Sequence, residues 1–404
     1  MTRTRFSIAL FAALFGVGSV AIQRAAAYEY EGYYLFLGNY PSGQVSWSHD
    51  VQGAAHDDNN WFITNTDFIW KIPVQRDLST VTQASPGVLR VSITAYPTLA
   101  GYAHFGDPVV YRFSGTDYLI VPIEDSNATC TSGLPGAVAI FRCTDLSYVD
   151  HVAFPGQCND AGWVAVKSNG DLVSSRQHVG APAGSPPASQ GGLRFYNFDW
   201  ASLHATGQGS MSFAQEVIMV NEQGLPLEMV TMQGGEFSPS GELLYLVSGF
   251  HDDDNGLEDR EGIHVLETTS YQRIAHSTRG FGHFDFYYDP GFPNYGEPEG
   301  LTVWDLDDGR APGIAGQLHV TRLDNDPTFD DIAFKHYTNV IRVNASSTCQ
   351  SGTPACPFRT VVAGYNFAWP RAEVRIRAGT YPEVMTLNKR IRLSAENGVA
   401  RIGG

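Results

Sequence analysis

Positively charged residues are scarce in this chain. Its 404 residues include 26 Lys and Arg against 42 Asp and Glu, which gives a formal net charge of −16. Binding to nucleic acid or to an anionic membrane requires a basic surface, so this balance argues against both partners. Charged residues of either sign make up only 17% of the chain. That share is too low for the charged helical faces of a coiled coil.

Several chemical signatures are also missing. The chain has no P-loop, no Gly-x-Ser-x-Gly elbow, no His-Glu-x-x-His pair and no dinucleotide-binding fingerprint. Its five cysteines include no Cys-x-x-Cys pair, which argues against a thiolate zinc site. The sequence therefore names no reaction through a known motif.

An apolar run at the N-terminus has the features of a secretion signal. Arg3 and Arg5 precede a run from Phe6 to Ile22, and Ala25-Ala26-Ala27 supplies small residues for cleavage. The run contains glycine and serine and is shorter than the ~20 residues that a membrane span needs. We therefore expect residues 1–27 to be a cleaved signal peptide, leaving a secreted protein with no membrane span. An uncleaved anchor is the alternative, and the periplasm or the cell surface is a possible destination.

Cysteine content fits this compartment. Five cysteines in an exported protein predict two disulfides and one free thiol. The simplest pairings by chain distance are Cys349–Cys356 and Cys130–Cys143, which would leave Cys158 free. A Cys143–Cys158 pairing is the alternative.

Glycine (42 residues) and proline (22 residues) are abundant, which favours short strands joined by turns. Five segments share one pattern: a glycine, an extended segment, a polar turn and a β-rich run, followed by a third and often a fourth run. They begin at Gly53, Gly106, Gly162, Gly234 and Gly300. Three to four short strands repeated five times predict an all-β fold, a five-bladed β-propeller over residues 28–345. A pair of β-sandwiches would explain the strands but not the repeats.

The pattern changes at Ser346. Residues 374–383 (VRIRAGTYPE) and 389–398 (KRIRLSAENG), preceded by 357–361 (PFRTV), resemble the opening of a pectin-lyase-like right-handed β-helix. The resemblance covers residues 346–404 and implies a cap followed by the first parallel coils. It implies no catalytic residue, because family members carry those on later coils. A solenoid needs several coils to bury a core, so we expect a β-helix that is incomplete in this sequence, or an appendage docked on the propeller.

Each repeat carries an acidic residue close to its glycine. The inner strand of a propeller blade begins beside the central channel, so these side chains are candidates to converge there. They are Asp50, Asp107, Asp160, Glu236 and Glu299. Strand side chains alternate between faces, which predicts a common face for Asp50, Asp107 and Glu299.

Carboxylates that converge on a narrow channel can bind calcium, or act as acid and base on a glycosidic bond. We therefore predict Asp50, Asp107 and Glu299 as catalytic residues and as calcium ligands. The segment from Glu297 to Thr302 also resembles the Glu-Gly-Leu blade start of calcium-bound nucleotidases and lactonases. The predicted ligand-binding residues are His49, His104, Asp160, Glu236 and Glu297.

Other polar and aromatic clusters are given weaker roles. We expect His49 and Asp50 in the channel and Asp57 and Asp58 in a turn at the rim. For His56 the sequence does not decide between these two positions. The acidic runs 251–259 and 324–331 are expected to be solvated loops, with calcium binding as the alternative for the first. Aromatic residues in predicted loops suit stacking on sugars; they are Tyr287, Tyr288, Phe292, Tyr295 and Trp369.

Two functions from different classes follow. The first is a secreted recognition protein that binds an extracellular glycan or a surface protein, supported by export, acidity and the lack of a catalytic motif. The alternative is a calcium-dependent extracellular hydrolase of glycosidic, phosphoester or lactone bonds that uses the channel carboxylates. The sequence slightly favours recognition. Convergent carboxyl groups with shifted pKa values would favour the hydrolase, and a channel filled by apolar side chains would exclude it.

Overall fold

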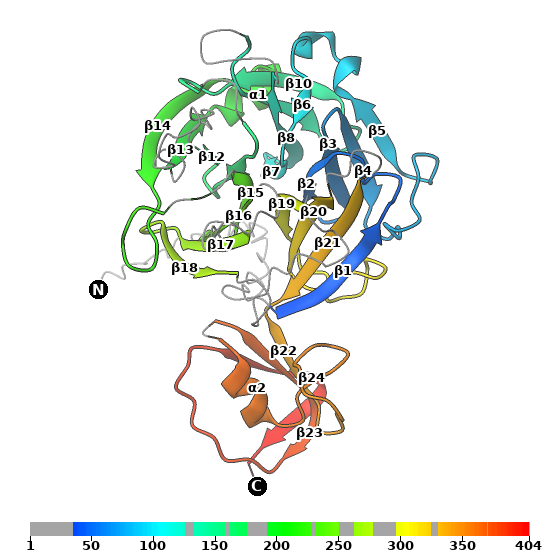
Figure 1. Cartoon of the computed structure of the whole chain (residues 1–404), viewed down its shortest axis with the longest axis vertical. Coiled ribbons are helices and arrows are strands. Elements are labelled where there is room, and N and C mark those ends of the chain that lie inside the picture. Colours follow the sequence, from blue (N-terminus) through cyan, green and yellow to red (C-terminus); the bar gives the residue numbers. More distant parts are fainter. Residues whose placement is uncertain are drawn as a thin grey trace, which may run out of the picture.

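A computed structural model describes residues 35–125, 133–157, 161–175, 192–227, 229, 232–249, 262–277, 296–324, 330–369 and 371–403. Within these residues, five antiparallel sheets surround a central axis, and a separate three-stranded parallel sheet lies beside them (Figure 1). The protein is therefore the five-bladed β-propeller that the repeats predict. The predicted signal peptide lies outside the described residues. No helix within them is long and apolar enough to cross a membrane.

The first four blades follow one another along the chain. Blade 1 is β2 (Val51–His56), β3 (Asn60–Asn65), β4 (Phe68–Pro73) and β5 (Leu89–Ser92). Blade 2 is β6 (His104–Phe105), β7 (Val109–Phe113), β8 (Thr116–Glu124), β9 (Ala137–Arg142) and β10 (Tyr148–Ala153). Blade 3 is β11 (Ala165–Val166), β12 (Leu172–Ser175), β13 (Gly192–Phe198) and β14 (Met211–Ile218). Blade 4 is β15 (Met232–Phe237), β16 (Leu243–Ser248), β17 (Gly262–Glu267) and β18 (Gln272–His276).

The fifth blade combines distant parts of the chain. Its inner strands are β19 (Gly296–Val303), β20 (Leu318–Asp324) and β21 (Asp331–Thr338). Its outermost strand is β1 (Leu35–Gly43), which precedes blade 1 in the sequence and pairs antiparallel with β21. This pairing closes the ring through backbone hydrogen bonds.

Few residues are helical. Two 3-10 turns, η1 (Ile93–Ala95) and η2 (Pro97–Leu99), follow blade 1. Helix α1 (Trp200–Thr206) begins where the Asp199 side chain accepts the N–H of Ser202, and it ends at Gly207 with φ 75°. These are the standard caps of a short helix.

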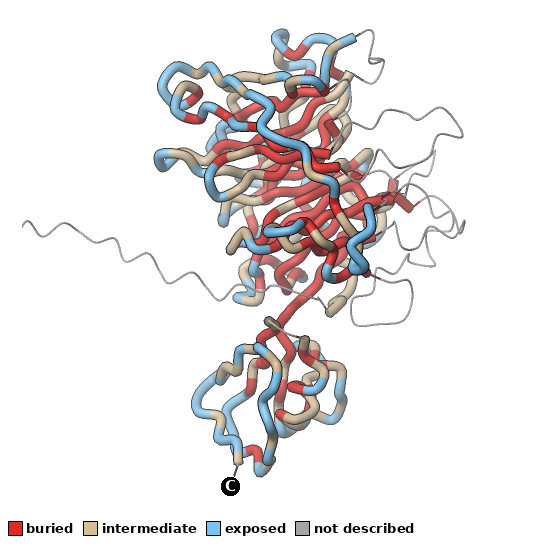
Figure 2. Tube along the Cα trace, turned by 90° about the vertical axis from the view of Figure 1, so that its left-hand side faces the viewer, coloured by how far each residue is buried: buried red, intermediate tan, exposed pale blue. Residues whose placement is uncertain are grey.

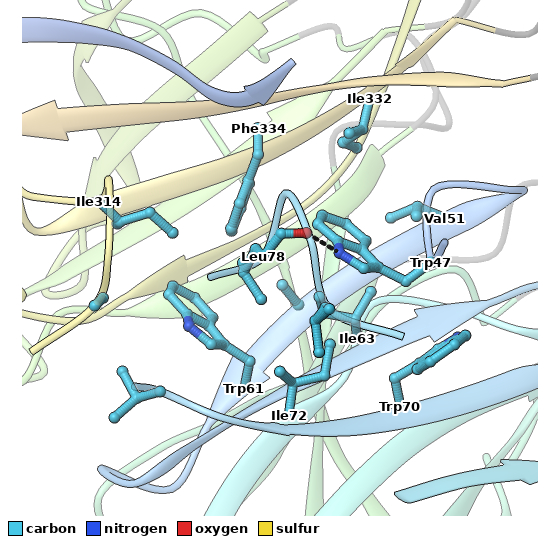
Figure 3. Packing of buried hydrophobic residues seen from close by; sticks show 14 of the residues in the cluster. Trp47, Val51, Trp61, Ile63, Trp70, Ile72, Leu78, Ile314, Ile332 and Phe334 are labelled. Carbon is cyan, nitrogen blue, oxygen red and sulfur yellow. Dashed lines mark hydrogen bonds between the residues drawn. The ribbon is translucent and has the colours of Figure 1, made fainter. Parts of the chain in front are cut away.

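Apolar side chains fill the space between neighbouring blades. Because each blade has a neighbour on both faces, middle strands are buried on both sides: all six residues of β16 are buried. Between blades 1 and 5, Trp61 packs edge-on against Phe334 with ring centroids 5.4 Å apart. Trp47 lies in the same cluster and donates its indole N–H to the Leu78 carbonyl at 2.9 Å (Figure 3). Burying each such side chain contributes roughly 1.5–3 kcal/mol.

The C-terminal unit is a parallel sheet with one short helix. Strands β22 (Val340–Val343), β23 (Glu373–Tyr381) and β24 (Arg392–Ile402) pair in parallel, and α2 (Val361–Phe367) lies between β22 and β23 in the sequence. Much of this unit is exposed, whereas the propeller strands are mostly buried (Figure 2). Three parallel strands do not by themselves establish the right-handed β-helix that the sequence resembles.

Ion pairs join the C-terminal sheet to the propeller. Asp307, in the turn after β19, is almost fully buried and pairs with Arg342 at 3.1 Å and with Arg375 at 3.4 Å. Glu242, in the turn between β15 and β16, pairs with Arg371 at 3.1 Å. Both turns follow the C-terminal ends of inner strands, so the sheet attaches to one face of the ring.

One disulfide prediction is confirmed and one is wrong. Cys349 and Cys356 are bonded. Cys143 is a free, buried thiol in the apolar cluster between blades 1 and 2, so it pairs with neither Cys130 nor Cys158. Those two residues lie outside the described ranges. Its side chain, in the turn directly after β9, points into the apolar core, which chain distance alone could not show.

Candidate active site at one mouth of the channel

Glycines of four of the five repeats bring the inner strands together at the axis. A Cβ atom on Gly53 would lie 2.5 Å from the Cα of Asp107, and one on Gly300 would lie 2.6 Å from the Cα of Gly53. One on Gly234 would lie 2.6 Å from the Cα of Gly300. A Cβ on Gly106 would meet the backbone of blade 3 in the same way. Only glycine permits this approach, so the ring pinches the channel at its centre.

Asp107 fills the space inside this ring. Its carboxyl group is fully buried and accepts backbone N–H groups from Ala54 at 3.1 Å, Gly235 at 3.2 Å and Leu301 at 3.4 Å. Burial raises the pKa of Asp107 well above its usual value, and the three amides partly oppose that shift. Since the three donors come from three other blades, the geometry favours a structural role for Asp107 over the predicted catalytic one.

Strand ends on one side of the ring carry a cluster that we call the acidic mouth. It consists of Asp50, Glu124, Glu297, Glu299 and Asp330, with His49, His104 and Gln233. Inner strands begin on this side, and the second strand of each blade ends here because it runs antiparallel to the first. The mouth therefore gathers both strand starts, such as Glu297 on β19, and strand ends, such as Glu124 on β8.

Blades 1 and 5 meet at the mouth through Asp330. One of its carboxylate oxygens accepts the backbone N–H of Asp50 at 2.9 Å and contacts Nδ1 of His49 at 2.8 Å. Asp50 has φ 50°, a strained value for a residue with a side chain. Burial, followed by the repulsion of Asp330, raises the pKa of Asp50, while His49 opposes the shift. Ligand atoms of these three residues lie within 4.8 Å of one another, close enough to hold a cation together.

Asp330 was expected in a solvated loop, and that expectation is wrong. Its side chain is only 7% exposed because it sits beneath His49, whose side chain is 82% exposed. The acid directly precedes the third strand of its blade, which runs parallel to the first and therefore starts at the same mouth.

Glu299 and Glu297 form the deeper wall of the mouth. Burial, and then the charges of Glu297 and Asp50, raise the pKa of Glu299 well above its usual value. Gln233 of blade 4 donates its amide to Glu297 at 2.6 Å. The guanidinium of the fully buried Arg322 lies against Gly296, at the start of the same strand.

Glu124 faces this wall from blade 2. It is the cross-strand partner of His104, whose Nδ1 lies 3.6 Å from a Glu124 carboxylate oxygen. The other oxygen accepts the N–H of Ala161. Burial raises the pKa of Glu124 to about 7 and lowers the pKa of His104 to about 4. The charge of Asp50 also acts on His104, so Asp50 lies close enough to influence the histidine that contacts Glu124.

Glu124 was missed by the sequence search, which considered only acids near the repeat glycines. An available signal was its position as the acid ending the apolar strand YLIVPIE. Antiparallel pairing returns that end to the start of the inner strand, so the second strand of each repeat had to be searched as well.

Glu236 and His56 lie at the opposite end of the channel. Glu236 accepts the N–H of Val303 at 2.8 Å, and burial raises its pKa to about 7. His56 stacks on Trp304 with ring centroids 4.4 Å apart, and burial lowers its pKa to about 4. Neither joins the acidic mouth. Asp57 accepts the N–H of Asn60 at 2.8 Å in the turn between β2 and β3, as the sequence predicts.

The remaining predicted aromatic and acidic residues lie away from the acidic mouth or outside the residues that the structure describes. Trp369 packs against Phe367 in the C-terminal unit, with ring centroids 5.6 Å apart. The described ranges omit Asp160, residues 251–259, Tyr287, Tyr288, Phe292 and Tyr295.

Comparisons with known proteins give remote structural similarity only. No family model and no curated protein matches the chain. A GH43_1 enzyme from Xanthomonas citri complexed with xylose is 11% identical, with 73% of this chain and 89% of that one covered and a TM-score of 0.44. The native Bacillus subtilis arabinanase Arb43A is 10% identical, covering 73% and 95%, with a TM-score of 0.35. The Dos1 propeller is 12% identical, covering 70% of this chain and 59% of that one, with a TM-score of 0.31. Similarity at this level carries no argument about activity.

Proposed function

We propose that this protein is a hydrolase that cleaves a glycosidic bond at the acidic mouth. The observation that carries the proposal is the pairing of unlike carboxyl groups there. Burial brings the pKa of Glu124 to about 7, so its carboxyl group keeps a proton well above the usual range of a glutamic acid. Asp50, on the neighbouring blade, is about half exposed and has a smaller upward shift. Two carboxyl groups with separated pKa values are the requirement for acid and base catalysis of glycoside cleavage.

Each residue then has a definite task. Glu124 donates a proton to the oxygen of the leaving group, and the N–H of Ala161 fixes the orientation of its carboxyl group. Asp50 attacks the anomeric carbon or activates the water that does so. Asp330 orients Asp50 through its backbone N–H and holds His49 beside it. Glu299, kept protonated by burial and by its acidic neighbours, can donate a hydrogen bond to a substrate hydroxyl group.

The mouth favours this reading over the recognition function that the sequence slightly preferred. A binding site for a neutral glycan has no need of buried carboxyl groups with raised pKa values, such as those of Glu124 and Glu299. Perturbed acids of this kind gather where proton transfer is needed. A calcium requirement remains a prediction, and His49, Asp50 and Asp330 suit a cation better than Asp107, whose oxygens already accept three N–H groups.

The test compares two buried glutamates with the same shifted pKa. Glu124→Gln should lower hydrolysis of glycosides with poor leaving groups, such as oligosaccharides, by about 100-fold or more, the usual loss of a general acid. Glu236→Gln is the matched control: its pKa is also about 7, but it lies at the other end of the channel. The control should retain activity. A wild-type protein that hydrolyses none of a panel of aryl pentosides and hexosides, with or without calcium, would refute the proposal.

Two further proposals concern the rest of the chain. We propose that the C-terminal sheet is the opening of a right-handed β-helix, supported by the parallel, in-step pairing of Val374 with Leu393 and of Ile376 with Ala395. An experimentally determined structure of the full chain would test whether the turn of this C-terminal sheet is right-handed. We also propose secretion after cleavage before Tyr28, which N-terminal sequencing of the exported protein would test.

A further inference from the structure

Two buried histidines face each other in blade 5, away from the acidic mouth. His319 on β20 and His336 on β21 are cross-strand partners. Both side chains are buried, with exposed fractions of 0% and 3%. Their Nδ1 atoms are 2.7 Å apart, which is a hydrogen-bond distance.

The outer nitrogens of both rings are already committed. Nε2 of His319 lies 2.8 Å from the carbonyl oxygen of Trp304, and Nε2 of His336 lies 2.6 Å from the carbonyl oxygen of Tyr40. A carbonyl oxygen only accepts hydrogen bonds, so each Nε2 must carry a hydrogen. A neutral imidazole has one N–H. Two neutral rings would therefore place two Nδ1 lone pairs against each other at a distance where they repel.

We propose that His319 and His336 share one added proton between their Nδ1 atoms and form a pH-dependent clasp on the closure of the propeller ring. The shared proton turns the repulsive contact into a charge-assisted hydrogen bond. The clasp connects the carbonyl of Tyr40 on β1, the strand that closes the ring, with the carbonyl of Trp304 after β19. This inference does not depend on the proposed hydrolase activity.

The surroundings of the pair set the direction of its pH dependence. His56 faces His319, and the Arg310 guanidinium lies 5.0 Å from the ring of Trp304. Lys335 is the buried neighbour of His336 along β21, and on the side of β1 the carboxylate of Asp77 accepts the Tyr40 hydroxyl at 2.6 Å. Among the described residues, no carboxylate forms an ion pair with either ring.

Burial without a neighbouring carboxylate disfavours protonation of the His319–His336 pair. It lowers the pKa of His336 to about 4, and together with His336 it lowers the pKa of His319 well below the usual range. The closed clasp binds one proton more than the open pair, so acid favours closure. Above the transition, each pH unit lowers the closed-to-open ratio tenfold. The transition should lie below the ordinary histidine value of about 6.5.

Room for an opened ring is available beside the pair. His336 and Tyr40 line a cavity of about 370 Å³ whose far wall is Thr353, Pro354 and Ala355 of the disulfide loop. When the proton leaves, one ring can turn into this space and release its carbonyl. Release of Tyr40 would loosen β1 along its pairing with β21.

Histidine-labelled full-length protein tests the clasp directly. Proton–nitrogen NMR between pH 8 and pH 4 should show both rings as Nε2–H tautomers in acid, with one strongly deshielded shared proton. Hydrogen exchange of β1 amides, corrected for intrinsic rates, should become slower over the same pH range. A ring that keeps a neutral Nδ1–H in contact with its partner at every pH would overturn the proposal.

Matched variants separate the clasp from general acid effects. In His336→Asn the side-chain amide takes the place of Nδ1 and donates to His319 without an added proton, so β1 protection should lose its pH dependence. His151→Asn alters a half-buried histidine on β10 and should leave that dependence intact. Equal pH profiles in the wild type and His336→Asn would overturn the clasp. If His336→Asn fails to fold, the wild-type NMR titration decides alone.

Discussion

The two ends of the central channel use similar residues for different purposes. Glu124 at the acidic mouth and Glu236 at the opposite end both have a pKa raised to about 7 by burial. Glu236 is tied to the Val303 N–H beside the turns that carry the C-terminal sheet. Glu124 has a 20% exposed side chain beside His104, whereas the charge of Glu236 acts on the buried Asp107. A shifted pKa alone therefore does not mark a site; what distinguishes Glu124 from Glu236 is its position at the acidic mouth.

Breaking the glycine ring should have the largest effect, because it separates the two ends. Gly300→Ala would force a methyl group to 2.6 Å from the Cα of Gly53 and into the Asp107 carboxyl group. We expect a loss of more than about 4 kcal/mol in the free energy of unfolding, or no folded protein. Urea denaturation followed by tryptophan fluorescence measures it.

Gly162→Ala is the control for that change. A Cβ there would meet its nearest atom, the Met232 carbonyl oxygen, at 3.5 Å, an ordinary contact. The variant should unfold within about 1 kcal/mol of the wild type. Equal destabilisation of both variants would contradict a ring held together at specific contacts.

A pH profile sharpens the contrast between the two glutamates. If Glu124 donates the proton, the hydrolysis rate should fall tenfold per pH unit above pH 7, because the folded pKa of about 7 marks the loss of that proton. Steady-state kinetics from pH 4 to 9 gives the profile. In Glu236→Gln the fall in the hydrolysis rate above pH 7 should occur at the same pH as in the wild type. A shift of this fall in Glu236→Gln would contradict the assignment of the proton donor to Glu124.

The opposite end should respond in stability instead of activity. Asp307→Asn weakens the pairs with Arg342 and Arg375, and the side chain is only 5% exposed. We expect a loss of about 1–3 kcal/mol and faster hydrogen exchange in β22 and β23, with hydrolysis unchanged. Asp308→Asn alters an exposed pair with Arg310 and should cost less than about 1 kcal/mol.

Calcium should have the smallest effect on the stability of the protein and should bind only at the acidic mouth. Calorimetry on the mature protein, with thermal melts with and without chelator, tests the predicted ion. Binding should raise the melting temperature by a few degrees and disappear in Asp330→Asn. Binding that persists in Asp330→Asn but is lost in Asp107→Asn would place the ion at the centre of the ring instead.

The propeller was readable from sequence because its repeats depend on local features. Each repeat glycine marks a place where inner strands approach, and the turns and alternating runs mark the strands. The closure by β1 was not readable, since pairing Leu35 with Thr338 leaves no local trace. The C-terminal change at Ser346 was visible, yet β22 at Val340–Val343 already belongs to the parallel sheet.

The site was readable in part for the same reason. The search near the repeat glycines had singled out Asp50 and Glu299, and the blade-start resemblance Glu297; the three lie at one mouth, whereas Glu236 lies beyond its glycine, near the end of β15. Alternation could not show that the glycine ring closes around Asp107. Glu124 and Asp330 required knowledge of strand direction, because they mark the end of a second strand and the start of a third.

The pairing of β1 with β21 also determines when the propeller ring can close during synthesis. Residues 35–43 emerge from the ribosome before every other strand, but their partner strand, residues 331–338, is made only after the other four blades. Closing so long a loop costs entropy that no early contact can offset. The nascent chain therefore stays open until nearly the whole propeller has been synthesised, and β1 remains without its partner strand while the other four blades are made.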